Sequence, residues 1–177
     1  MKKEADNKMP DSRRDGLLAE YNALRSEILK RIELRNSILF GTLTFAGVLL
    51  GFGLTTPTLA LIYIIISMFL AAAWVQSDVL ISDLGRYIRE KLETPQTGLY
   101  WETQRQKDRL ASMSSRRFRP SVVFSTVGVF LVTQAVAILI AFSNLHAFTP
   151  LEWVLGAVAI IAILLTIYFF QYASRQN

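Results

Sequence analysis

The sequence predicts an all-α, polytopic membrane protein whose four transmembrane helices form two hairpins, with amphipathic helices on the cytoplasmic side. Four long apolar runs carry no ionisable residue in their cores, and 52% of the 177 residues are hydrophobic, which is too apolar for one soluble domain. Nine of the Lys and Arg residues lie in residues 1–37, nine lie in residues 76–120, and the last is Arg175. Because cytoplasmic loops retain an excess of Lys and Arg, this asymmetry predicts that both termini are cytoplasmic.

The N-terminal polar segment has two parts. Residues 1–16 are expected to form a disordered N-terminus, and residues 17–37 a cytoplasmic amphipathic helix that runs into the first span with little or no break. The apolar stripe of this helix, at spacings of three and four, comprises Leu17, Tyr21, Leu24, Ile28 and Ile32. No apolar stretch follows the basic start until Ile38, so we predict an uncleaved anchor and no cleavable signal peptide.

The two predicted hairpins comprise residues 38–76 and 121–172, and residues 173–177 form a cytoplasmic tail. A bilayer core requires roughly 20 helical residues, and the four runs have about this length. Thr56-Pro57 and Thr149-Pro150 place a capping hydroxyl before a proline, and Glu152 adds the capping-box spacing; Pro120 opens the third span in the same way. The connectors between the spans of each hairpin are short, so the outer side of the protein is expected to be nearly bare.

The central segment, residues 77–120, is predicted to be cytoplasmic and helical. A second apolar stripe ends at Thr94-Pro95, and a weaker, polar helix follows an aromatic-rich turn. The second stripe comprises Leu80, Leu84, Tyr87 or Ile88, and Leu92. The two stripes either pack on each other within the chain or oligomer, or form a docking surface for a soluble cytoplasmic partner.

Three residues within the spans are candidates for helix packing. Gly47 and Gly51 are four residues apart, a spacing that lets two helix backbones approach closely. Gln134 lies near the middle of the third span, where its amide needs a hydrogen-bond partner in lipid. Gln134 either joins helices or lines a polar path, and the first role is favoured. We also expect a homo-oligomer in the bilayer.

No residue pattern predicts catalysis, a cofactor or a metal. The chain has no Cys, and its only His, His146, lies in the second outer connector without Asp, Glu or Cys partners, so it is interpreted as solvated and not as a metal ligand. Asp78 and Asp83 are interpreted as helix N-terminal charges and ion-pair partners of nearby arginines rather than a catalytic pair. The net charge of +5 is attributed to an anionic membrane surface, so no nucleic acid is expected as a partner.

Three sequence blocks resemble a group of small bacterial four-pass membrane proteins. These blocks are EYNALR…EILKRIELRN before the first span, and GRYIRE and GLYWE after the second. The resemblance covers much of the first 105 residues and implies the same topology in a bacterial inner membrane, but it transfers no activity or site residue. The chain departs from the known membrane effectors of antiphage signalling because no nucleotide-sensing module is recognisable.

Two functional hypotheses follow. The first is a non-enzymatic inner-membrane protein whose cytoplasmic helices mediate oligomerisation or hold a soluble partner at the membrane. The second is a regulated pore or membrane-perturbing effector, in toxicity or antiphage defence, whose cytoplasmic helices receive the trigger. The absence of charged residues inside the spans slightly favours the first hypothesis.

Overall fold

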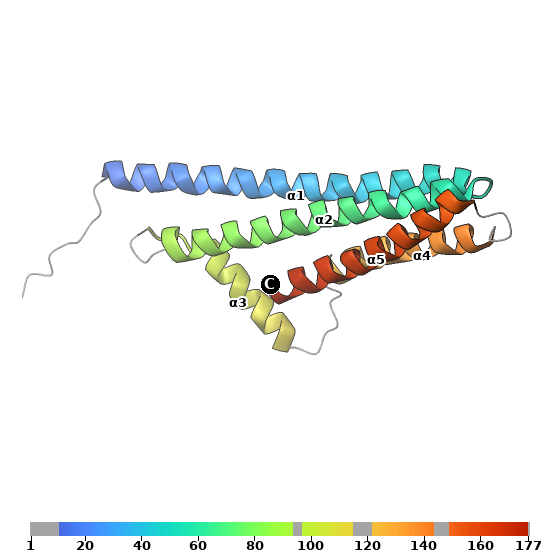
Figure 1. Ribbon diagram of the computed structural model, residues 1–177. Helices are drawn as coiled ribbons and strands as arrows, with labels where there is room; N and C mark the ends of the chain where they lie inside the picture. The colour runs from blue at the N-terminus through green and yellow to red at the C-terminus, as the bar shows by residue number, and fades with distance from the viewer. Residues whose placement is uncertain (1–10, 94–96, 115–121, 144–148, 177) are drawn as a thin grey trace, which may run out of the picture. The chain divides into compact units, whose positions relative to one another are not determined.

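A computed structural model of the chain describes residues 11–93, 97–114, 122–143 and 149–176, and these residues are almost entirely helical (Figure 1). The elements are α1 (Asp11–Gly53), α2 (Pro57–Tyr87), the π-helical segment η1 (Ile88–Leu92), α3 (Trp101–Ser114), α4 (Val122–Ser143) and α5 (Pro150–Gln176). No strand occurs among the described residues, which confirms the all-α prediction. Helices α1, α2, α4 and α5 are long and apolar enough to cross a membrane.

Two helices extend beyond their predicted bounds. Helix α1 begins at Asp11, so residues 11–16, which were expected to belong to a disordered N-terminus, are helical, whereas residues 1–10 lie outside the described residues. Gly16 lowers helix stability by only about 1 kcal/mol, which does not end a helix supported on its C-terminal side. Helix α2 likewise continues past Gln76, the predicted end of the second span. Its only proline is its first residue, Pro57, so no later residue interrupts the helix before Tyr87.

Some of the helix starts and ends predicted from proline positions fall within the described residues. Helices α2 and α5 begin at Pro57 and Pro150, as expected from the missing amide hydrogen of proline. The second stripe ends at Leu92, where η1 ends. The predicted signals at Pro95 and Pro120, and also His146, lie outside the described residues.

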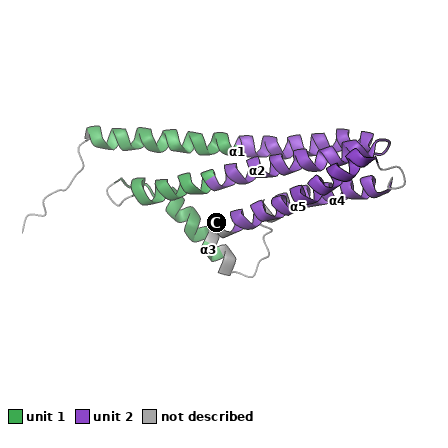
Figure 2. Ribbon diagram, viewed as in Figure 1, with its two compact units in different colours: residues 1–32, 80–118 green, residues 33–79, 119–177 purple. Residues whose placement is uncertain are grey.

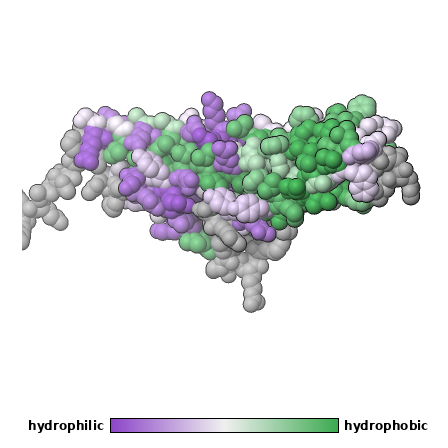
Figure 3. Space-filling view, in the orientation of Figure 1, coloured by the Kyte–Doolittle hydropathy of each residue, from purple (hydrophilic) through white to green (hydrophobic). Residues whose placement is uncertain are grey.

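The chain divides into two compact units (Figure 2). Unit 1 comprises residues 1–32 and 80–118, and unit 2 comprises residues 33–79 and 119–177. On the face drawn in Figure 3, unit 2 is largely hydrophobic, whereas unit 1 is mostly hydrophilic. In unit 2, Phe40 and Leu139 are each 69% exposed, which suits a lipid environment and would be unfavourable in water.

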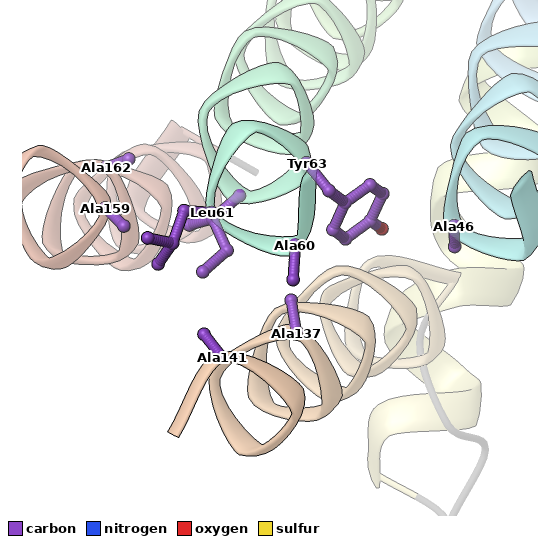
Figure 4. Close-up of a cluster of buried hydrophobic side chains, with 9 residues drawn as sticks. Ala46, Ala60, Leu61, Tyr63, Ala137, Ala141, Ala159 and Ala162 are labelled. Carbon is purple, nitrogen blue, oxygen red and sulfur yellow. The ribbon is translucent and has the colours of Figure 1, made fainter. Parts of the chain in front are cut away.

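The core of unit 2 consists of two apolar clusters. The alanine-rich cluster contains small residues of all four helices, including Ala46, Ala60, Ala137 and Ala159 (Figure 4). The aromatic cluster contains Trp74, Phe130 and Phe170, and the ring centroid of Phe170 lies 5.9 Å from that of Trp74 and 5.7 Å from that of Phe130. Small residues let the helix backbones approach closely, and the aromatic rings bury large apolar surfaces.

The buried residues of α2 follow a heptad-like spacing. Six of the ten recur at intervals of four and three along one face: Ala60, Ile64, Ser67, Ala71, Trp74 and Asp78. A repeat of 3.5 residues keeps one face of a helix directed at its neighbours, as in coiled coils and most helix bundles. This face of α2 therefore supplies both apolar clusters and the polar residue between them.

Candidate functional site

A polar layer crosses the core of unit 2. Gln134 of α4 is 1% exposed, and its side-chain amide donates hydrogen bonds to the hydroxyl oxygens of Ser67 on α2 (3.3 Å) and Thr166 on α5 (3.1 Å). The Thr166 hydroxyl in turn donates to the carbonyl oxygen of Ala162. Gln134 thus joins three helices, which is the cross-helix role favoured from the sequence.

Apolar residues flank this polar layer on both sides. The polar residues are Ser67 on α2, Gln134 on α4 and Thr166 on α5. Three or four positions away along the same helix, each has a member of the alanine-rich cluster in one direction and a member of the aromatic cluster in the other. These flanking pairs are Ile64 and Ala71 on α2, Ala137 and Phe130 on α4, and Ala162 and Phe170 on α5. The polar groups form an isolated layer, and apolar packing separates this layer from both ends of the bundle.

The two candidate packing glycines do not contribute to packing within the chain. Gly47 and Gly51 are exposed on α1, and a Cβ atom added at either position would meet no other atom within 4 Å. Gly53 is the glycine of α1 at a close approach, because an added Cβ would lie 3.2 Å from the Cβ of Ala60. The close packing of the alanines was not predicted from the sequence, although the heptad spacing on α2 indicates which face of that helix is buried.

An ion pair joins α1 to α2 beside the aromatic cluster. Arg35 donates to Asp78 at 2.6 Å, and the two side chains are only 16% and 9% exposed. The Arg35 guanidinium also lies 5.4 Å from the centre of the Trp74 ring, within cation–π range. The sequence predicted ion pairing for Asp78 but assigned it to other arginines, since sequence spacing does not show which helices face each other.

Asp83 also forms an ion pair, but at the surface, 3.7 Å from Arg86. Neither aspartate lies at a helix N-terminus, because α2 begins at Pro57 and continues past both residues. The interpretation of Asp78 and Asp83 as helix N-terminal charges is therefore wrong. The span and the cytoplasmic segment form one unbroken helix, so no helix begins near either residue.

A second polar contact joins α2 to the start of α5. Glu152 accepts hydrogen bonds from the backbone amide of Thr149 (2.7 Å) and from the Thr58 hydroxyl (2.8 Å). The amide of Glu152 lies 3.4 Å from the Thr149 hydroxyl oxygen, which completes the predicted capping box. The sequence pattern predicted this cap but not the contact with Thr58.

In unit 1, the two apolar stripes pack against each other. Ile28 of α1 and Ile88 and Leu92 of η1 are buried, and the remaining residues of the α1 stripe surround them. Ile81 occupies the position expected for Leu80, and Tyr87 is 44% exposed, with its hydroxyl donating to Glu20 at 3.0 Å. The stripes thus cover each other within the chain.

The N-terminus of α3 is held by a carboxylate from outside the helix. Glu93 accepts hydrogen bonds from the backbone amides of Glu102 (2.6 Å) and Thr103 (2.7 Å), and from the Thr103 hydroxyl (2.7 Å). These amides are among the first of the helix and have no partner within it. Glu93 also follows η1 directly, so it ties the start of α3 to the end of the second stripe.

Trp101 lies beside this cap as an exposed aromatic side chain bordered by arginines. The residue is 46% exposed, and the guanidinium groups of Arg25 and Arg105 lie 3.7 and 5.1 Å from the centre of its ring. Glu102 is 8% exposed and pairs with the same two arginines, at 3.3 and 3.7 Å. We call Trp101, Arg25, Arg105 and the neighbouring exposed Tyr100 the aromatic–arginine surface.

None of these clusters has the composition of a metal centre. Within the described residues, no group of three His, Asp or Glu side chains is arranged to hold a metal ion. The comparisons add no relative, since no protein-family model, curated protein or solved structure matches the chain. The inference of function therefore depends on the polar layer, the aromatic–arginine surface and the distribution of charge.

Proposed function

We propose that this chain is a non-enzymatic, multi-pass protein of a bacterial inner membrane, and that unit 1 is a cytoplasmic module for oligomerisation or for holding a soluble partner at the bilayer. In this proposal the four apolar helices form two hairpins, and both termini are cytoplasmic. The unequal distribution of Lys and Arg supports the orientation, and the sequence resemblance supports the bacterial membrane.

The observation that carries the proposal is the aromatic–arginine surface of unit 1. Trp, Tyr and Arg are the residue types most enriched at the energetic centres of protein interfaces. Trp101 is held in place by Arg25 and by the capped start of α3, so its ring is ordered before binding. A preordered aromatic side chain loses little conformational entropy when a partner covers it.

The chemistry of the remaining clusters also supports a binding role. The carboxylates of Asp78, Glu93, Glu102 and Glu152 are each engaged by an arginine, a hydroxyl or a helix N-terminus. Such carboxylates contribute to helix association and helix capping. The polar layer, enclosed by apolar packing, serves the same structural purpose, since a buried polar residue specifies the register of a bundle.

The test uses the full chain expressed in bacterial cells, with a photocrosslinking residue placed at Tyr100. We expect crosslinks to a soluble protein or to a second copy of the chain, at an unchanged membrane potential. Trp101→Ala should remove these crosslinks, whereas Trp153→Ala, which alters a 63% exposed tryptophan of α5, should preserve them. Crosslinks that persist in Trp101→Ala, or that are absent from the unmodified chain, would contradict the proposal.

The alternative function, a regulated pore or membrane-perturbing effector in toxicity or defence, is favoured by one observation. Gly47 and Gly51 face outward on α1 without contacts in the chain, so they are free to pack against a second copy. A pore formed in this way would depolarise cells rapidly on expression. Gly51→Leu should then abolish depolarisation, while Val48→Leu, a change at a neighbouring exposed position, should not.

A further inference from the structure

Three buried side-chain atoms of unit 2 have no hydrogen-bond partner among the described residues. One is Nε of Arg35, which belongs to the ion pair with Asp78. The other two are the Oε1 atom of Gln134 and the hydroxyl oxygen of Tyr63, in the middle of the core. Their side chains are 1% and 0% exposed, so neither atom reaches the surface of the bundle. An unpaired polar group in an apolar interior costs several kcal/mol of folding free energy. Two such groups in one core therefore require a compensating hydrogen-bond partner.

Both atoms lie at the polar layer, although Tyr63 itself is a member of the alanine-rich cluster. The hydroxyl of Tyr63 faces the hydroxyls of Ser67 and Thr133, although no hydrogen bond of normal geometry joins it to either of them. Ser67 is also the residue that accepts from the Gln134 amide at 3.3 Å. Figure 4 shows the Tyr63 ring reaching from α2 toward the helix that carries Ala46, with the hydroxyl at its far end.

The unused hydrogen-bonding capacity identifies the chemical class of the ligand. Gln134 Oε1 is an acceptor, the Tyr63 hydroxyl both donates and accepts, and the neighbouring hydroxyls provide further acceptors. No charged side chain is a member of this layer, so an ion would lack a counter-charge, whereas a water molecule both donates and accepts. Buried waters typically make two to four hydrogen bonds to groups of this kind.

We propose that the polar layer binds internal water between α2 and α4, where water donates to Gln134 Oε1 and bonds the Tyr63 hydroxyl. The site is discrete, because apolar residues of the two clusters flank Ser67, Gln134 and Thr166 on both sides along their helices. It differs from a conducting path, which would need polar groups through both of these clusters. The bound water completes the hydrogen bonding of the residue that joins three helices.

Hydroxyl-radical labelling of the full chain in lipid nanodiscs, read by mass spectrometry, tests this site. Radiolysis generates the radical from water itself, so a buried side chain is labelled only where water is bound beside it. We expect Tyr63 to be labelled strongly. Trp74 and Phe130, which are equally buried aromatic residues of the apolar core, are the internal controls and should remain unlabelled.

Each outcome of the labelling bears on the proposal. Labelling of Tyr63 no higher than that of Phe130 would overturn it, and so would equal labelling of Tyr63 and Trp74, which would indicate water throughout the bundle. Gln134→Leu should lower Tyr63 labelling to the level of Phe130, and retention of the label in a folded variant would contradict the site. The comparison within the unmodified chain decides the question even if that variant fails to fold.

Discussion

Asp78 and Asp83 have the same side chain and lie on the same helix, yet their surroundings give them different energetic roles. Asp78 pairs with Arg35 in a site where both groups are largely removed from solvent, whereas Asp83 and Arg86 are about half exposed. Removal of one partner from a buried pair leaves an uncompensated charge, while an exposed charge remains solvated. At the residue scale, burial decides the effect of a substitution.

We therefore predict that Asp78→Asn lowers the free energy of unfolding by about 3 kcal/mol, the lower end of the cost of leaving a buried charge unpaired. The matched control is Asp83→Asn, which should change it by about 0.5 kcal/mol or less. Unfolding of the purified protein in detergent micelles measures both values.

A double variant gives a second test of the same pair. Arg35→Met combined with Asp78→Leu should recover most of the lost stability, since two apolar side chains replace both charges. Equal effects of the two Asp→Asn substitutions would show that the Arg35–Asp78 pair is not buried in the micelle-embedded protein.

At the scale of elements, α3 is a short polar helix whose order depends on contacts from outside itself. Its sequence contains few apolar residues, so apolar burial contributes little, and a helix of 14 residues is only marginally stable by itself. The cap from Glu93 and the pair between Arg25 and Glu102 supply the missing stabilisation. The position of Trp101, the first residue of α3, is determined by the same contacts.

Glu93→Ala is expected to destabilise the start of α3 by about 1 kcal/mol, the typical value of an N-cap. Hydrogen–deuterium exchange at the amides of Glu102 and Thr103 should therefore accelerate about fivefold, the factor that corresponds to 1 kcal/mol. Glu90→Ala is the matched control, since Glu90 is exposed and lies 4.0 Å from Arg89 without capping a helix. Unchanged exchange in Glu93→Ala would show that α3 forms without this cap.

At the scale of the whole molecule, the proposed orientation places every cluster of Lys and Arg on one side of the membrane. The native chain contains no Cys, so single Cys residues introduced into it are unambiguous labels. Cys at Thr55, in the turn between α1 and α2, and at Leu145, outside the described residues, should react with a membrane-impermeant reagent in intact cells. Cys at Ser114 should react only after the membrane is permeabilised, and labelling of Ser114 in intact cells would reverse the topology.

Much of the fold was predictable because long apolar runs, proline positions and stripe residues act locally. Pro57 and Pro150 mark helix starts through their own backbone geometry, and the α1 stripe from Leu17 to Ile32 follows the helical period. The candidate site was less predictable. Gln134 was recognisable as a polar residue in an apolar run, but Ser67 and Thr166 as its partners depend on how three distant helices face each other.

The sequence by itself determined the all-α class, the four apolar helices and the concentration of charge in two polar segments, because hydropathy and helical period are properties of neighbouring residues. Only the tertiary structure decided that alanines form the close contacts of the core while Gly47 and Gly51 face outward, and that Asp78 meets Arg35. These choices depend on the rotation of each helix about its axis. That rotation is set jointly by all the helices of the bundle, so no single segment encodes it.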